Sequence, residues 1–140
     1  ARETALRLLA RREHSCRELR EKLAGRGYAA ETIRALIEDL LRLDLVSDQR
    51  FAETFVRSRK AQGYGPLRLR QELRQRGVDE GLAAAFIDGD DDEWLTQLRR
   101  LREKRFGEGP PRDRRERARQ WRYLQYRGFT SDQIKYALKE

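Results

Sequence analysis

Apolar residues recur at the same places around three glycines of this chain. Counted from the glycine, the positions at minus four, plus one, plus six, plus nine and plus ten are apolar in every copy. The glycines are Gly27, Gly77 and Gly128, which are 50 and 51 residues apart. A fixed period of this length is typical of a repeated structural unit. The pattern therefore predicts one unit that is used three times.

The spacing of apolar residues within each unit indicates helices. Leucine recurs at spacings of three and four, and no segment shows the sustained alternation of a strand. Each unit reads as helix, turn, helix, short glycine turn, helix. We predict an all-α fold of three tandem three-helix repeats, similar to helix-turn-helix modules and forming an elongated, curved molecule. The expected repeats are residues 1–46, 47–89 and 90–140.

Local signals place the helix ends. Ser15 with Glu18 forms a capping-box pattern, and Gly27 suits the position after a helix where positive φ is needed. Inside the third helix of the first repeat, we expect Ile33, Leu36, Ile37 and Leu40 to face inward. Ser47, Pro66 and Asp79 mark the starts of the helices in the second repeat. The third repeat should contain helices from near Trp94, over about 112–127 and over 131–139.

The charge balance suggests a polyanionic partner. The chain carries 32 Lys and Arg against 24 Asp and Glu, a net charge of +8. From Arg99 to Arg127 there are 12 basic and 4 acidic residues. This excess makes nucleic acid or an acidic protein a plausible partner. The preference for arginine suits phosphate or carboxylate contacts, although a GC-rich genome produces the same bias.

The helix that follows Pro111 carries the clearest candidate surface. Arg115, Arg119 and Arg122 are spaced by four and three residues and should form one stripe. The expected buried side carries Ala118, Trp121 and Leu124. A solubilising face explains such a stripe equally well on charge alone. We favour a contact surface because Asp113 and Glu116 lie outside the stripe and should leave its charge unneutralised.

Two further pairs of basic residues are candidate contacts. Arg100 and Lys104 form a similar pair on the preceding helix, and Arg70 and Arg74 flank the apolar seam of the second repeat. These seven residues are the predicted contacts with a groove or with DNA.

Catalytic and metal-binding sites are disfavoured. His14 is the only histidine and Cys16 the only cysteine, so neither a catalytic triad nor a tetrahedral zinc site can be assembled. We expect a solvated or helix-terminal His14 and a small apolar role for Cys16. The acidic run from Asp90 to Asp92 lacks the spacing of a calcium loop, and no phosphate-binding glycine motif occurs. The sequence predicts no cofactor, no metal and no enzymatic activity.

Base-specific DNA reading is also disfavoured. The last helix of each repeat begins with acidic or small residues at 30–32, 79–81 and 130–132, which would repel phosphate and read few bases.

No apolar run approaches the roughly 20 residues of a membrane span. The lone cysteine excludes an internal disulfide and fits a cytoplasmic protein.

Three segments of the chain carry a distinctive pattern. They are ALRLLARREHSCRELREKL at Ala5–Leu23, SDQRFAETFVRSRKAQGYGPLRLRQELRQRGV at Ser47–Val78 and YLQYRGFTSDQI at Tyr123–Ile134. Together they resemble the RecX family of bacterial RecA regulators. The middle segment is specific because a generic helical repeat does not require its RFA and GYGP blocks. These carry Asp48, Arg50, Phe51, Ala52, Gly65 and Pro66, followed by Leu73 and Gly77.

The resemblance implies a regulator without catalysis. Proteins that resemble RecX bind in the groove of the RecA filament on single-stranded DNA and inhibit its extension, strand exchange, coprotease activity and the SOS response. An alternative interpretation is a non-specific DNA-binding module, on single or double strands, that competes for the DNA. We expect a monomer with no membrane association.

Overall fold

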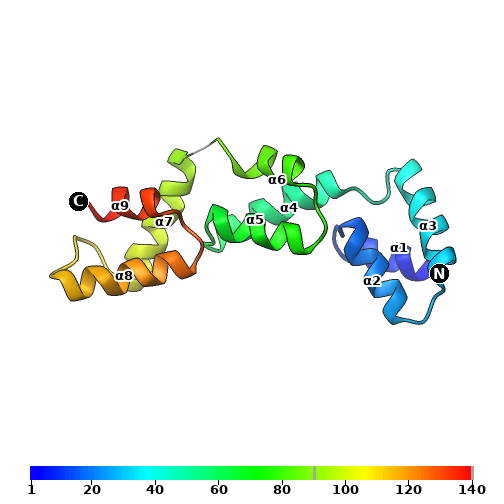
Figure 1. The fold of residues 1–140 in the computed structure, drawn as a ribbon, viewed down its shortest axis with the longest axis horizontal. Coiled ribbons are helices and arrows are strands. Elements are labelled where there is room, and N and C mark those ends of the chain that lie inside the picture. Colours follow the sequence, from blue (N-terminus) through cyan, green and yellow to red (C-terminus); the bar gives the residue numbers. More distant parts are fainter. Residues whose placement is uncertain (90, 140) are drawn as a thin grey trace. The chain divides into compact units, whose positions relative to one another are not determined.

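The computed structural model of this chain describes residues 1–89 and 91–139, apart from the side chain of residue 91. All regular elements of that part are α-helices, labelled in Figure 1. They are α1 (Arg2–Arg11), α2 (Cys16–Gly25), α3 (Ala30–Arg42), α4 (Asp48–Ala61), α5 (Pro66–Gln75), α6 (Glu80–Ile87), α7 (Asp91–Phe106), α8 (Arg114–Tyr126) and α9 (Ser131–Leu138). The all-α prediction is confirmed, and the helices follow one another as three three-helix repeats.

The chain divides into two compact units. Unit 1 comprises Ala1–Phe55 and Leu73–Ala83, and unit 2 comprises Val56–Glu72 and Ala84–Glu140. The division passes through α4, α5 and α6, so each unit contains an end repeat and part of the middle one.

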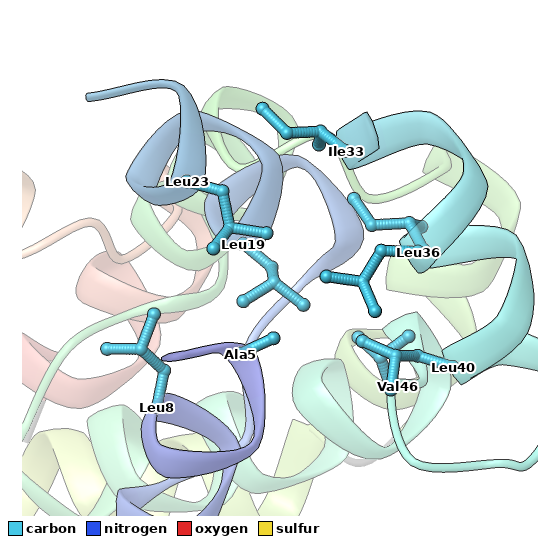
Figure 2. Packing of buried hydrophobic residues seen from close by; sticks show 9 residues of the cluster. Ala5, Leu8, Leu19, Leu23, Ile33, Leu36, Leu40 and Val46 are labelled. Atoms are coloured by element: carbon cyan, nitrogen blue, oxygen red, sulfur yellow. The ribbon is translucent and has the colours of Figure 1, made fainter. Parts of the chain in front are cut away.

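Unit 1 has a core built from α1, α2 and α3. Figure 2 shows that its apolar side chains point toward one another from the three helices. The buried cluster consists of Ala5, Leu8, Leu19, Leu23, Ile33, Leu36, Ile37, Leu40 and Val46. It includes the four α3 residues that were predicted to face inward. Burial of such side chains is the main stabilising contribution in a small unit.

Ser15, Ser47 and Asp79 cap helices as predicted, through side-chain oxygens that accept hydrogen bonds from backbone amides. Ser15 Oγ accepts a hydrogen bond from the Glu18 amide at 3.1 Å, and Glu18 Oε1 accepts one from the Ser15 amide at 3.1 Å. Ser47 Oγ accepts from the Arg50 amide at 3.1 Å. Asp79 Oδ2 accepts from the Gly81 amide at 3.1 Å. Each cap satisfies an amide that has no partner inside its own helix.

Unit 2 is centred on α7, α8 and α9. Its fully buried side chains include Trp94, Leu98, Leu124, Phe129 and Ile134. Trp94 Nε1 donates to the Ile87 carbonyl at 2.9 Å, so the one polar atom of this indole is satisfied inside the core.

The buried side of α8 differs from the prediction. Ala118 is exposed, whereas Gln120 is only 3% exposed. Gln120 Oε1 accepts a hydrogen bond of 2.8 Å from Nε of Arg102, which is itself buried, and Arg102 also donates to the Gly109 carbonyl. The prediction for Ala118 is wrong because a hydrogen-bonded polar pair, which has no apolar signature, takes this place in the core.

His14 is not solvated. It lies in the turn between α1 and α2 and is 2% exposed. Nδ1 is 3.1 Å from the Arg12 carbonyl oxygen, and Nε2 is 2.9 Å from Lys22 Nζ. A lysine ammonium only donates, so Nε2 accepts and the ring is neutral with its proton on Nδ1. Of the two predicted alternatives, the helix-terminal position is confirmed and the solvated one is not.

The predicted role of the acidic run cannot be followed in full, because Asp90 lies outside the described residues.

No helix in residues 1–89 and 91–139 combines the length and apolar composition needed to cross a membrane.

Candidate interaction surface

The predicted arginine stripe lies on an exposed side of α8. Arg115, Arg119 and Arg122 are all exposed. The helix begins after Asp113, whose carboxylate accepts from the Glu116 amide at 2.8 Å. Placement of the stripe away from Leu124, which is fully buried, follows from the spacing of four and three residues.

The stripe is not free of acidic partners. Arg119 Nη1 lies 3.8 Å from Glu116 Oε2, so the expectation that Glu116 leaves the stripe unneutralised is wrong. The two residues are three positions apart, which brings them onto one side of a helix. Solvent weakens this pair, because the Arg119 side chain is 62% exposed. Within the described part of the chain, Arg115 and Arg122 form no ion pair.

An aromatic residue that the sequence analysis did not identify continues the stripe. Tyr126 lies four residues after Arg122 on α8 and is 73% exposed. The guanidinium of Arg68 lies 5.3 Å from the centre of its ring, and Arg68 Nη1 donates to the Tyr126 carbonyl at 3.3 Å. The exposed face of α8 is therefore basic along its length and aromatic at its end. The signal in the sequence was the continued spacing from residue 122 to 126.

A second tyrosine nearby is surrounded by arginines. The guanidinium carbons of Arg59 and Arg127 each lie 4.0 Å from the centre of the Tyr64 ring, and that of Arg68 lies 4.6 Å away. Arg59 also binds both carboxylate oxygens of Glu72, at 2.8 and 3.3 Å. Arg127 donates to the Gly63 carbonyl at 3.2 Å. These contacts hold the GYGP turn against the turn between α8 and α9, which is a structural role.

The end of α7 carries a related cluster. Phe106 and Tyr123 meet edge to face, with ring centres 5.5 Å apart. Arg105 lies 4.5 Å from the centre of the Tyr123 ring, and Arg119 lies 5.3 Å from that of Phe106. Arginine therefore alternates with aromatic rings beside the stripe, and these contacts are attractive in their own right.

The remaining predicted contacts have different surroundings. Arg100 and Lys104 are exposed on α7 and form no ion pair with the residues that the structure describes. Arg70, in unit 2, binds the carboxylate of Asp88. Arg74, in unit 1, lies 2.9 Å from Glu80 Oε1. Local carboxylates thus offset the charge of Arg70 and Arg74, so the stripe on α8 is a stronger candidate than this pair.

Burial shifts the pKa values of both Cys16 and His14. Burial raises the pKa of the Cys16 thiol to about 11, and the Asp48 carboxylate acts in the same direction. Burial lowers the pKa of His14, which keeps its ring neutral, and the nearby Arg12 and Lys22 also lower it. Among residues 1–89 and 91–139, no three His, Cys, Asp or Glu side chains are grouped as metal ligands would be.

Family models match nearly the whole chain. Residues 1–40 match the model described as RecX, first three-helix domain. Residues 47–86 match the second three-helix domain, and residues 91–138 match the third. The three helical repeats of the structure thus have counterparts in one family, in the same order.

Solved structures share the fold. A crystal structure of RecX from Lactobacillus salivarius gives a TM-score of 0.81 at 23% identity, over 99% of this chain and 92% of that one. A crystal structure of a regulatory protein RecX gives a TM-score of 0.82 at 21% identity, over 99% and 72%.

Curated relatives are more similar in sequence. Regulatory protein RecX of Halorhodospira halophila is 52% identical over 136 residues, which is 97% of this chain and 84% of that protein. Regulatory protein RecX of Chromohalobacter salexigens is 43% identical, over 98% of this chain and 90% of that protein. The chain therefore belongs to the RecX family of regulatory proteins.

Proposed function

We propose that this protein is a non-enzymatic, cytoplasmic regulator that binds the RecA filament on single-stranded DNA as a monomer. It inhibits extension of the filament and thereby recombination, coprotease activity and the SOS response. Membership of the RecX family carries this proposal, through relatives that are up to 52% identical and are named regulatory proteins.

The repeats supply a physical rationale for this partner. A filament offers the same surface many times, and a chain of three related units can make several modest contacts at once. Linked contacts raise the overall affinity well above that of each contact alone. The neutral His14 and the protonated Cys16 support a role in binding instead of catalysis.

The test is inhibition of RecA-dependent ATP hydrolysis on single-stranded DNA. Purified protein should suppress hydrolysis at substoichiometric amounts, because a few bound molecules stop the extension of a long filament. Helicity measured by circular dichroism verifies that the added protein is folded. Unchanged filament assembly and turnover in the presence of folded protein would contradict the proposal.

The stripe on α8 is our candidate for part of this contact. The combined change Arg115→Glu, Arg119→Glu and Arg122→Glu should weaken inhibition and leave helicity unchanged. The control is Arg7→Glu, Arg11→Glu and Lys135→Glu, which makes the same charge change at other exposed positions. Equal potency of both triple variants would assign the stripe to solubility alone.

One observation favours a second candidate function, a non-specific DNA-binding module. The basic stripe leads to the exposed ring of Tyr126, and single-strand binders combine backbone charge with rings on which bases stack. The stripe variant should then reduce the log-log salt slope of single-strand binding by about 2, or about 0.7 for each lost phosphate contact.

Tyr126→Ala should weaken single-strand binding, and Tyr136→Ala is the matched control. Tyr136 is also exposed and also has an arginine, Arg99, 5.5 Å from the centre of its ring. Weak binding to naked DNA together with potent inhibition would favour the filament.

A further inference from the structure

The turn between the second and third helices of a repeat serves as a docking site in unit 1. Ser15, at the start of α2, donates through Oγ to the Arg76 carbonyl at 2.7 Å. Glu18 Oε2 lies 3.5 Å from Arg76 Nε. A Cβ placed on Gly77 would lie only 2.7 Å from Arg17 Cβ, so the first turn of α2 rests directly on the glycine.

Unit 2 contains the same kind of contact. The Gly65 amide donates to the Arg127 carbonyl at 2.8 Å, and the Leu67 amide donates to the Gly128 carbonyl at 2.9 Å. A Cβ on Gly128 would lie 2.3 Å from Arg68 Cβ. The first turn of α5 therefore rests on this glycine, as α2 does on Gly77. An arginine and glycine turn receives the start of a helix in both units.

The first repeat has the same turn, but among residues 1–89 and 91–139 no other segment rests on its glycine. Gly27 has a φ of 91°, and a Cβ there would have no atom within 4 Å. Val78 and Phe129 follow the two occupied glycines and are buried, whereas Tyr28 is only partly buried. The turn formed by Arg26, Gly27 and Tyr28, hereafter the Gly27 turn, is thus an exposed copy of a surface that is covered twice elsewhere.

A largely apolar hollow lies beside the Gly27 turn. It measures about 640 Å³ and is lined by Arg20, Ala24, Tyr28, Ala30, Ile33 and Arg34. In the middle repeat, the counterparts of Ala24 and Ala30 are Arg74 and Glu80, which form an ion pair of 2.9 Å. The two alanines of the first repeat leave this place empty and apolar.

We propose that the Gly27 turn is a docking site for the first turn of a helix in a partner protein. The fitting helix has Ser or Thr at its N-cap and Glu at its third position, as α2 has in Ser15 and Glu18. Its hydroxyl donates to the Arg26 carbonyl, and its glutamate faces the exposed Arg26 guanidinium. An apolar side chain of the same segment enters the hollow.

Charge and cap chemistry favour this occupant over the exposed start of α8 in a second copy of the chain. Arg20 adds positive charge at the rim of the hollow, whereas Arg34 is already paired with Glu31 and Glu38 at 3.2 and 3.6 Å. The exposed start of α8 has Asp113 as its cap. A carboxylate has no proton to donate to the Arg26 carbonyl, and its negative charge would repel the partial negative charge of the carbonyl oxygen.

The docking itself can be tested without any partner. The probe is a synthetic peptide of residues 14–25 of this chain, stapled through the positions of Leu19 and Leu23 so that it is helical. Titration into the isotope-labelled protein should shift the amide resonances of Arg26, Gly27 and Tyr28. A peptide with Ser15→Ala and Glu18→Gln should bind at least about tenfold more weakly, because it loses a hydrogen bond and an ion pair. Shifts confined to other residues, or equal affinity of the two peptides, would overturn the proposal.

That RecA supplies the helix rests on the proposed function and has its own test. Gly27→Asn keeps a residue that tolerates positive φ and places a side chain over the turn. Gly107→Asn is the control, since Gly107 has a φ of 85° and no atom within 4 Å of its Cβ position. We expect Gly27→Asn to raise the concentration for half inhibition of RecA about tenfold and Gly107→Asn to leave it unchanged.

The outcomes separate the two proposals. No inhibition by the unmodified protein would reject the proposed function, and the peptide titration would still decide the docking site. Inhibition that both asparagine variants retain in full would overturn the assignment of the Gly27 turn to RecA. Self-association in sedimentation velocity that Gly27→Asn abolishes would assign the turn to a second copy of the chain and overturn its assignment to a partner protein.

Discussion

Gly27 and Gly128 hold the same place in their repeats and differ in what surrounds them. Both have positive φ, 91° and 103°, in the region that glycine adopts without strain. A Cβ on Gly128 would lie 2.3 Å from Arg68 Cβ and 2.8 Å from the Arg68 amide nitrogen, whereas one on Gly27 would have no atom within 4 Å. The backbone requires glycine at both positions, and packing requires it only at Gly128. A repeated motif can therefore end a helix everywhere and join repeats only where a neighbour is present.

The largest effect is expected for Gly128→Ala. The new methyl group strains a left-handed backbone and also meets the backbone of Arg68, which cannot move aside as a side-chain end could. We expect a loss of about 2 to 5 kcal/mol in the free energy of unfolding. Urea denaturation followed by circular dichroism measures it. A loss no larger than that of Gly27→Ala would show that Arg68 and Gly128 are packed too loosely for the methyl group to clash.

The next effect concerns the occupied turn of unit 1. Ser15→Ala removes the cap of α2 and leaves the Arg76 carbonyl without the 2.7 Å hydrogen bond from Ser15 Oγ. We expect a loss of about 2 to 3 kcal/mol, since both the cap and the contact are lost. Ser47→Ala is the control, because Ser47 caps α4 through the Arg50 amide and should cost about 1 kcal/mol. Equal losses in urea denaturation would mean that the contact with Arg76 adds nothing to the cap.

These glycine turns also show what the sequence could predict. Helix ends at Ser15, Pro66, Asp79 and Gly27 were predictable because capping depends on residues only a few positions apart. The inward face of α3 followed from periodicity alone. The docking of Ser15 on Arg76 joins residues 61 positions apart, and no local pattern encodes such a pairing.

The candidate surface was predictable to a similar degree. Exposure of the stripe on α8 followed from its spacing. Its partial neutralisation by Glu116 was within reach of the same spacing argument, because Glu116 and Arg119 are three positions apart. The position of Arg68 over Tyr126 was not, because it joins residues 58 positions apart. Likewise, burial of Gln120 with Arg102 was hidden, because two polar residues satisfy each other in the core.

Gly27→Ala tests the exposed turn and should have a smaller effect. Only backbone strain at positive φ opposes the methyl group, since in the described part of the chain no atom beyond Gly27 and its two neighbours lies within 4 Å of it. We expect a loss of about 1 to 2 kcal/mol in the free energy of unfolding, measured by urea denaturation. A loss as large as that of Gly128→Ala would mean that crowding is not what distinguishes the two turns.

The smallest effect comes from pH and acts on the occupied turn through His14. This residue directly precedes Ser15, and its Nε2 accepts from the Lys22 ammonium at 2.9 Å. Protonation would turn Nε2 into a donor that faces a second positive charge. Arg12 and Lys22 oppose the imidazolium and Glu18 favours it, but burial is the largest cause and lowers the pKa of His14.

Stability should therefore fall as the solution is acidified. Because the folded pKa lies below the ordinary value of about 6.5, the unfolded chain takes up a proton first, and stability present above about pH 6.5 is lost toward the folded pKa. We expect the urea concentration at half unfolding to fall when the pH is lowered from about 7.5 to 5.5. This decrease should be smaller than the one that Ser15→Ala causes. Since His14 is the only histidine, its NMR titration measures the pKa without ambiguity. A His14 pKa above about 6.5 in the NMR titration would reverse the sign of this effect, because protonation of His14 would then stabilise the folded chain.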